Sequence, residues 1–168
     1  KESEHTYTDI AVKGDLAIGT GTGFYVEHMN RDAADSDATL VAAHTVVNGV
    51  TLKAASYEAD VTGLASNTGE IRPLGTSLVG DYHTAYALTL DTIKDIKGVG
   101  ANMDIQGNNV NVVVGEYDTA ALNGLDFADV VVTRKLAAGT TLDMSYGKID
   151  TSATADTTNF GAIINVKF

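Results

Sequence analysis

The sequence contains few side chains whose types and spacing could carry out catalysis. Its histidines, His5, His28, His44 and His83, are scattered, and none has the HExxH or paired-histidine spacing of a zinc site. Without cysteine, the chain has neither a thiolate nucleophile nor a disulfide framework. The glycine-rich stretch 19–23 lacks the lysine and the following helix of a phosphate-binding loop. We therefore predict that the protein is not an enzyme and uses no metal or other cofactor.

The charge balance limits the partners of the chain. With 11 Lys and Arg against 22 Asp and Glu, the formal net charge is −11 and the pI is about 4.5. Nucleic-acid binding requires clustered basic residues, so we predict no nucleic-acid partner. A protein that inserts through a bilayer remains compatible with this composition, because its charges can lie in loops and in a wet interior.

Hydrophobic residues recur with a period of two along most of the chain, which is typical of β-strands. The alternation predicts strands over 5–12, 16–28, 38–47, 50–60, 81–91, 98–105, 109–117, 125–136, 140–149 and 158–168. No apolar run reaches the roughly 18 residues of a transmembrane helix. The sequence therefore predicts an all-β chain in which residues 1–168 form one domain, a meander of about 9–10 antiparallel strands.

Two sizes of connection separate these strands. Tight turns are predicted at 13–15, 48–49 and 137–139, and longer polar connections at 30–37, 61–80, 117–124 and 150–158. Turns and long loops that alternate along an antiparallel meander are typical of outer-membrane barrels. The alternation is interrupted within 92–109, where residues 106–109 form either a bulge in one long strand or a tight turn.

The alternating apolar residues have two interpretations. In a soluble β-protein they would face a dry core, whereas in a transmembrane barrel they would face lipid and the polar residues would line a wet lumen. The second interpretation is favoured because the polar faces are rich in Gly, Asn, Thr and Ser, and because the apolar faces are uniform in side-chain size. The strand lengths also match a tilted bilayer crossing of about 9–11 residues.

The segment 134–168 resembles the closing hairpin of Gram-negative outer-membrane porins. It contains, in the order found in that family, a basic residue with a tight turn, the motif Thr-Leu-x-x-Ser-Tyr-Gly at 141–147, a loop of Asp, Thr and Ser, and a strand ending on Phe168. The resemblance implies an antiparallel transmembrane β-barrel in the outer membrane of a Gram-negative bacterium. It also implies contact with the lipid bilayer and lipopolysaccharide, and a homotrimer.

The final strand would carry the assembly signal of that family. Apolar residues alternate up to the last position, and Phe160, Ile164, Val166 and Phe168 resemble the signal that the barrel-assembly machinery reads. Porins have about 16–18 strands. The shorter meander here therefore implies a smaller barrel or the C-terminal portion of a larger one.

In such a barrel the polar side chains would line a channel for passive diffusion of small hydrophilic solutes and ions. The alternation assigns to this lumen Glu27, Lys53, His83, Asp104, Asn111, Asp129, Lys135, Asp143 and Lys167. The acidic excess predicts a preference for cations, because charged side chains in a pore select ions by sign. The connection 61–80 resembles in length the loop that narrows porin lumens, where Glu70 and Arg72 would face charges across a constriction; the alternative is an exposed loop.

A second hypothesis follows from the soluble interpretation. The chain would then be a secreted or cell-surface β-sheet protein, such as an adhesin or a filament subunit, whose apolar faces form a dry core. This hypothesis predicts a protein that stays in solution without detergent, whereas the channel hypothesis predicts stepwise conductance in planar bilayers.

Overall fold

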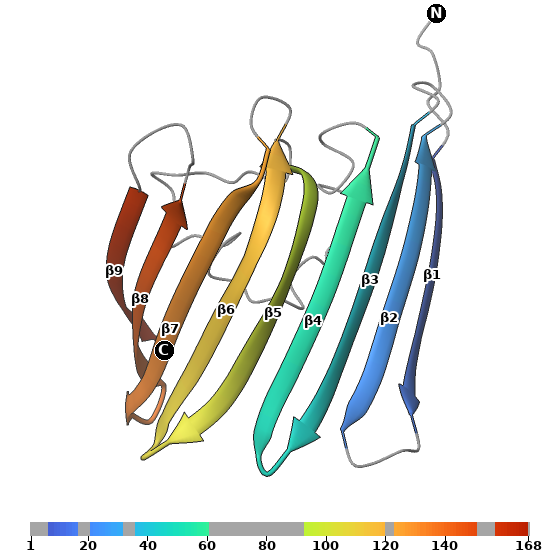
Figure 1. The fold of residues 1–168 in the computed structure, drawn as a ribbon. Coiled ribbons are helices and arrows are strands. Elements are labelled where there is room, and N and C mark those ends of the chain that lie inside the picture. Colours follow the sequence, from blue (N-terminus) through green and yellow to red (C-terminus); the bar gives the residue numbers. More distant parts are fainter. Residues whose placement is uncertain are drawn as a thin grey trace, which may run out of the picture.

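The computed structural model describes residues 7–16, 21–31, 36–60, 93–119, 123–150 and 157–167. These residues form one antiparallel sheet whose strands are hydrogen-bonded in sequence order (Figure 1). The strands are β1 (Tyr7–Leu16), β2 (Thr22–Arg31), β3 (Ser36–Val47), β4 (Val50–Ala59), β5 (Ile93–Ile105), β6 (Asn108–Thr119), β7 (Leu125–Ala137), β8 (Thr140–Asp150) and β9 (Thr157–Val166). The predicted all-β antiparallel meander is confirmed. No helix of the described part is long and apolar enough to cross a membrane.

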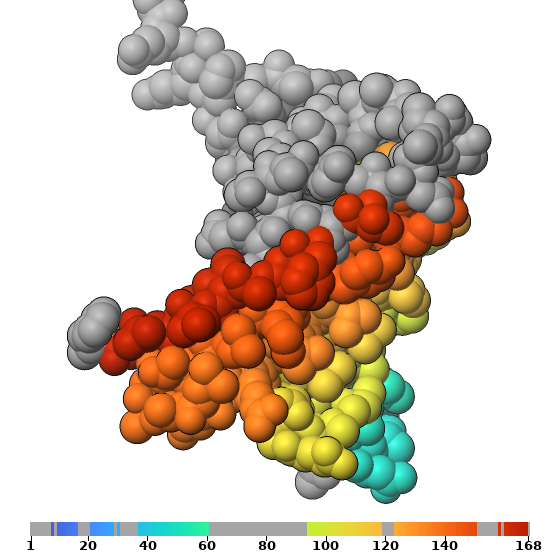
Figure 2. Space-filling view, turned by 90° about the vertical axis from the view of Figure 1, so that its left-hand side faces the viewer, coloured from blue at the N-terminus to red at the C-terminus, as the bar shows by residue number. Residues whose placement is uncertain are grey.

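The described sheet is open, so the expected closure into a barrel is not observed in it. β1 pairs with β2 and β9 pairs with β8, and the outer edge of each is unpaired within the described residues. Figure 1 shows these two strands on opposite sides of the sheet, and Figure 2 looks onto the β9 side. Because nine strands alternate in direction, β1 and β9 run the same way (Figure 1).

Tight turns lie at one end of the sheet. Asn48 and Gly49 join β3 to β4 with φ of 51° and 81°, and Gln106 and Gly107 join β5 to β6 with φ of 50° and 78°. Two consecutive residues with positive φ are the signature of the type I′ hairpin turn, whose twist matches that of the strands. Residues 106–107 therefore form a tight turn, which decides between the two interpretations of 106–109.

At the opposite end of the sheet, β2, β4, β6 and β8 end and β3, β5, β7 and β9 begin (Figure 1). The connections after β2, β4, β6 and β8 have four residues or more, against two in the turns after β3, β5 and β7. The predicted alternation is therefore confirmed only from β3 onward, because the connection after β1 has five residues. The strand expected over 81–91 lies outside the described residues. β4 and β5 are direct neighbours, paired from Thr51 with Asn102 to Glu58 with Asp95.

The turn predicted at 13–15 is wrong, because Lys13, Gly14 and Asp15 lie within β1. Gly14 is opposite Phe24 of β2, and a Cβ built on this glycine would lie 3.0 Å from Phe24 Cε1. An aromatic ring that covers a glycine on the neighbouring strand compensates for the missing side chain. Gly14 therefore reflects a close approach between two strands, and the chain reverses between Leu16 and Thr22.

A second close approach lies between β5 and β6, where Gly98 and Gly115 oppose each other. A Cβ on Gly98 would lie 2.8 Å from the carbonyl oxygen of Val114, and a Cβ on Gly115 would meet the carbonyl oxygen of Lys97 and lie 2.7 Å from Phe127 Cζ. The ring of Phe127, from β7, thus occupies the space that both glycines leave. Glycine positions of this kind let a sheet bend.

Candidate functional site

Alternate residues of each strand lie on the same face, and the two faces of the sheet differ in accessibility. On the face that we call the exposed face, Ile10 and Phe160 are 61% and 70% exposed. On the opposite face, which we call the covered face, Leu40, Tyr57 and Val113 are at most 1% exposed. Both faces are candidate functional surfaces, because each has a distribution of apolar and polar side chains that extends across several strands.

Large apolar side chains occupy the exposed face from one edge of the sheet to the other. They include Ile10, Val12, Val26, Val41, Leu52, Val99, Val114, Tyr146, Phe160, Ile164 and Val166. The register brings many of them side by side, as in the row formed by Val112, Val130, Tyr146 and Phe160 on β6 to β9. Large apolar patches on a protein surface mark sites of contact with another protein or with a membrane.

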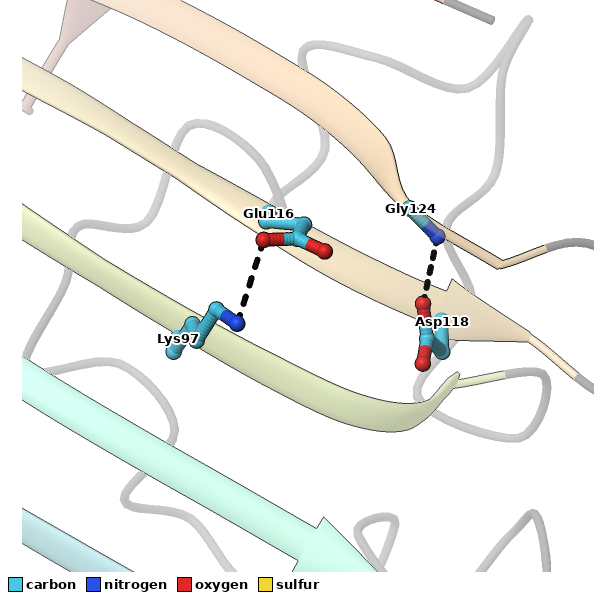
Figure 3. A network of polar contacts seen from close by, with 4 residues as sticks. All are labelled: Lys97, Glu116, Asp118 and Gly124. Carbon is cyan, nitrogen blue, oxygen red and sulfur yellow. Dashed lines mark hydrogen bonds and ion pairs between the residues drawn. The ribbon is translucent and has the colours of Figure 1, made fainter. Parts of the chain in front are cut away.

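Charged residues border this apolar band at the end of the sheet that carries the long connections. Lys97 Nζ lies 3.1 Å from Glu116 Oε2, and Figure 3 shows these two side chains pointing toward one another from β5 and β6. Next to them, Asp118 Oδ1 accepts a hydrogen bond of 2.6 Å from the backbone N–H of Gly124 (Figure 3). On β8, Lys148 and Asp150 form an ion pair of 3.6 Å. We call this border the charged rim.

Nearer the long connections, the covered face is apolar. The buried cluster comprises Ala38, Leu40, Ala42, Ala55, Tyr57, Ala59, Ile96, Val113, Tyr117, Leu125 and Phe127. The rings of Tyr117 and Phe127 have their centroids 6.0 Å apart at 48°, a tilted aromatic pair. Sequence reasoning missed this cluster because both faces are apolar here; in β3, for example, Leu40 and Val41 point to opposite faces.

Nearer the tight turns, the covered face is mostly polar, with Val46 and Ile163 among its apolar residues, and several of its polar side chains are hydrogen-bonded across strands. Asn102 and Asn109 exchange two hydrogen bonds, of 2.8 and 3.1 Å. Asn165 Nδ2 donates to Asp143 Oδ2 at 2.6 Å, and Lys53 Nζ donates to Asn111 Oδ1 at 3.1 Å. We call these six residues the polar band.

Most of the lumen residues predicted from the sequence share the covered face. The register places there Glu27, Lys53, Asp104, Asn111, Asp129, Lys135 and Asp143. Two of them are deeply buried, Glu27 at 3% and Asp129 at 1% exposure, and Glu27 accepts a hydrogen bond of 2.8 Å from the Tyr25 hydroxyl. Lys167 follows β9, and its backbone N–H donates to the carbonyl oxygen of Gly139 at 2.8 Å.

The remaining predicted residues fall into two groups. Phe160, Ile164 and Val166, from the expected assembly signal, lie on the exposed face and are 70%, 62% and 49% exposed. His83, Glu70, Arg72 and Phe168 lie outside the described residues.

Three residues of the polar band were missed by sequence reasoning, namely Asn102, Asn109 and Asn165. Each has the same strand parity as a residue that was chosen, Asp104, Asn111 and Lys167 respectively, so the alternation could have found them. Their partners could not be predicted, because hydrogen bonds across strands depend on register.

Neither a metal site nor a relative identifies the protein. Within the described ranges, no group of three or more His, Cys, Asp or Glu side chains could hold a metal ion. No family model, curated protein or solved structure matches the chain. The functional argument therefore rests on the two faces of the sheet.

Proposed function

We propose that the chain builds the wall of an outer-membrane porin, a water-filled channel for passive diffusion of small hydrophilic solutes and ions. The observation that carries this proposal is the apolar exposed face, which extends over the sheet from Ile10 on β1 to Val166 on β9. In the proposed channel this face contacts lipid, and the covered face surrounds the lumen.

The free energy of hydration favours this orientation. Burying a Val, Leu, Ile or Phe side chain is worth about 1.5–3 kcal/mol relative to leaving it in water. Many such side chains are exposed here on a single surface, so that a soluble monomer would lose a large part of its possible hydrophobic stabilisation. Acyl chains remove the same side chains from water, and the charged rim then lies at the level of the lipid headgroups.

The polar band supports the assignment of the covered face to the lumen. Amide and carboxylate groups at positions such as Asn102 and Asp143 would be costly in hydrocarbon, because each polar group there needs a partner. Among the described side chains of this face, the carboxylates of Asp15, Glu27, Asp104, Asp129 and Asp143 outnumber the ammonium groups of Lys13, Lys53, Lys135 and, directly after β9, Lys167. This excess supports a preference for cations.

Closure of the wall is part of the proposal. A sheet in a bilayer must close, because an unpaired strand edge leaves backbone N–H and C=O groups without partners in hydrocarbon. The free edges of β1 and β9 therefore have to be paired in the membrane. The homotrimer, the assembly machinery acting on Phe160 and the following apolar residues, contact with lipopolysaccharide, and a constriction formed by Glu70 and Arg72 belong to the same proposal.

Reconstitution into planar bilayers tests the function. The purified protein should give stepwise conductance, and a salt gradient should give a reversal potential of the sign that cation selectivity produces. Trypsin-digested protein serves as the control for membrane leakage. A protein that is monodisperse in buffer without detergent and gives no conductance steps would rule out the channel.

The buried apolar cluster of the covered face favours a second candidate. Side chains such as Leu40, Val113 and Phe127 are excluded from water, as in the dry core of a secreted or cell-surface β-protein. In that case the exposed face would contact another protein, for example the next subunit of a filament, and the purified chain would assemble in buffer.

A further inference from the structure

Lys53 is a cationic residue of the covered face whose hydrogen-bond partner is a neutral amide. Its side chain is partly buried, and its ammonium donates to the neutral amide oxygen of Asn111 at 3.1 Å. In the described part of the chain Lys53 forms no ion pair with a carboxylate, although the sequence has 22 acidic residues. Charges that lose contact with water are stabilised by an opposite charge, so an anion would complement the partly buried Lys53.

The side chain of Lys53 crosses a neighbouring strand to reach its partner. Lys53 and Asn111 lie on β4 and β6, and the residue of β5 opposite Lys53 is Gly100. Because Gly100 has no side chain, Lys53 extends across β5 to reach Asn111. The row of the sheet that contains Lys53 therefore has no side chain on β5.

The histidine opposite Lys53 on the neighbouring strand β3 leans away from the lysine, toward β2. His44 of β3 is directly opposite Lys53 in the register, and its ring lies beside Gly23 of β2. A Cβ built on Gly23 would lie 3.1 Å from His44 Nε2 and 3.2 Å from Asp15 Oδ1. The carboxylate of Asp15 is thus on the far side of His44 from Lys53 and leaves the lysine uncompensated.

We propose that Lys53, positioned by Asn111, is a binding subsite for the oxyanion group, carboxylate or phosphate, of a small solute. An ammonium group has three donors, and Asn111 uses one of them. The other donors can bind an oxyanion through charge-assisted hydrogen bonds, which are stronger than neutral ones. The physiological role of this subsite, which is to retain anionic or zwitterionic solutes on an otherwise acidic wall, rests on the proposed channel.

Solution NMR of the ¹⁵N-labelled full chain in detergent micelles tests the subsite directly. The side-chain amide resonances of Asn111 are followed during titration with sodium phosphate and with sodium acetate. Sodium chloride at the same ionic strength is the reference. The oxyanions should cause saturable shifts that chloride does not cause. Lys53→Met should weaken the apparent affinity by on the order of tenfold, the loss of one charge-assisted interaction.

Two matched variants separate the subsite from general charge effects. Lys53→Arg should keep the saturable shifts, whereas Lys94→Met removes an exposed lysine near the start of β5 and should change nothing. Shifts caused equally by acetate and phosphate identify the shared oxyanion chemistry, and shifts with phosphate alone assign the subsite to phosphate groups; both support the proposal. Shifts that do not saturate, that chloride reproduces, or that saturate with unchanged affinity in Lys53→Met overturn it.

The NMR readout is independent of conduction. Saturable binding in a protein that forms no channel in bilayers would keep the subsite and reject the porin proposal. Conductance without saturable binding would keep the porin proposal and reject the subsite.

Discussion

At the scale of single residues, Gly115 is the position where an added methyl group should be most harmful. Its Cβ would meet the carbonyl oxygen of Lys97 and the ring of Phe127, so backbone and an aromatic side chain would both have to move. Gly115→Ala should lower the free energy of unfolding by about 1–3 kcal/mol, the range for overpacked positions. Urea titration in detergent micelles, followed by circular dichroism, measures this loss.

A neighbouring substitution controls for general perturbation of β6. Val114→Ala alters a side chain that is 45% exposed and introduces no clash, so it should cost less than Gly115→Ala. The double variant Gly115→Ala with Phe127→Ala should cost less than the sum of the single variants, because removal of the ring relieves part of the overlap. Strict additivity would mean that Phe127 does not fill the space beside Gly115.

At the scale of the elements, the two type I′ turns differ at their first residue and permit a reciprocal exchange. Gln106 and Asn48 both have a left-handed backbone, which costs most L-residues roughly 1–2 kcal/mol but is easier for asparagine. Gln106→Asn should therefore raise the free energy of unfolding by a fraction of that amount, and Asn48→Gln should lower it. Urea titrations of the two variants measure both changes in the free energy of unfolding. Changes of the same sign in the two variants would contradict the turn assignment.

The strands also predict how a charge is tolerated along the exposed face. Val112 lies in the middle of the apolar band, and Ser56 is opposite Lys97 in the charged rim. Val112→Arg should cost about 2–4 kcal/mol of folding free energy in lipid vesicles, and Ser56→Arg about 0–1 kcal/mol, because the penalty depends on depth. Equilibrium folding into vesicles provides the measurement. Similar costs at both positions would place the apolar band outside the hydrocarbon layer.

At the scale of the whole molecule, single cysteine variants can distinguish lipid from lumen, because the sequence has no cysteine of its own. Asn109 and Val110 are consecutive residues of β6 that point to opposite faces. In vesicles, Asn109→Cys should react with a water-soluble maleimide, and Val110→Cys should react only with a lipid-soluble one. The second candidate function predicts the opposite preference for protein in buffer.

Much of the arrangement could be predicted from the sequence, and the failures have physical causes. The alternation correctly placed Lys53, Asp129 and Asp143 on one face. A strand has only two faces, so once one residue is assigned to a face, the faces of all other residues in that strand follow. The turn at 13–15 failed because glycine serves both turns and close strand approaches, which composition cannot separate. The lysine–asparagine contact could not be predicted, since it depends on the pairing of β4 with β5 across a long connection.

The common direction of β1 and β9 constrains any closed form of this sheet. Eight neighbouring pairs use the antiparallel ladder, but a ninth contact made directly between the two outermost strands would have parallel geometry, with slanted and evenly spaced hydrogen bonds. An intervening strand would avoid this seam only by running opposite to both. A closed barrel therefore contains either one parallel strand pair among antiparallel ones or an odd number of additional strands. Because parallel pairing is slightly less stable per residue, such a parallel pair would be the place where the barrel opens first.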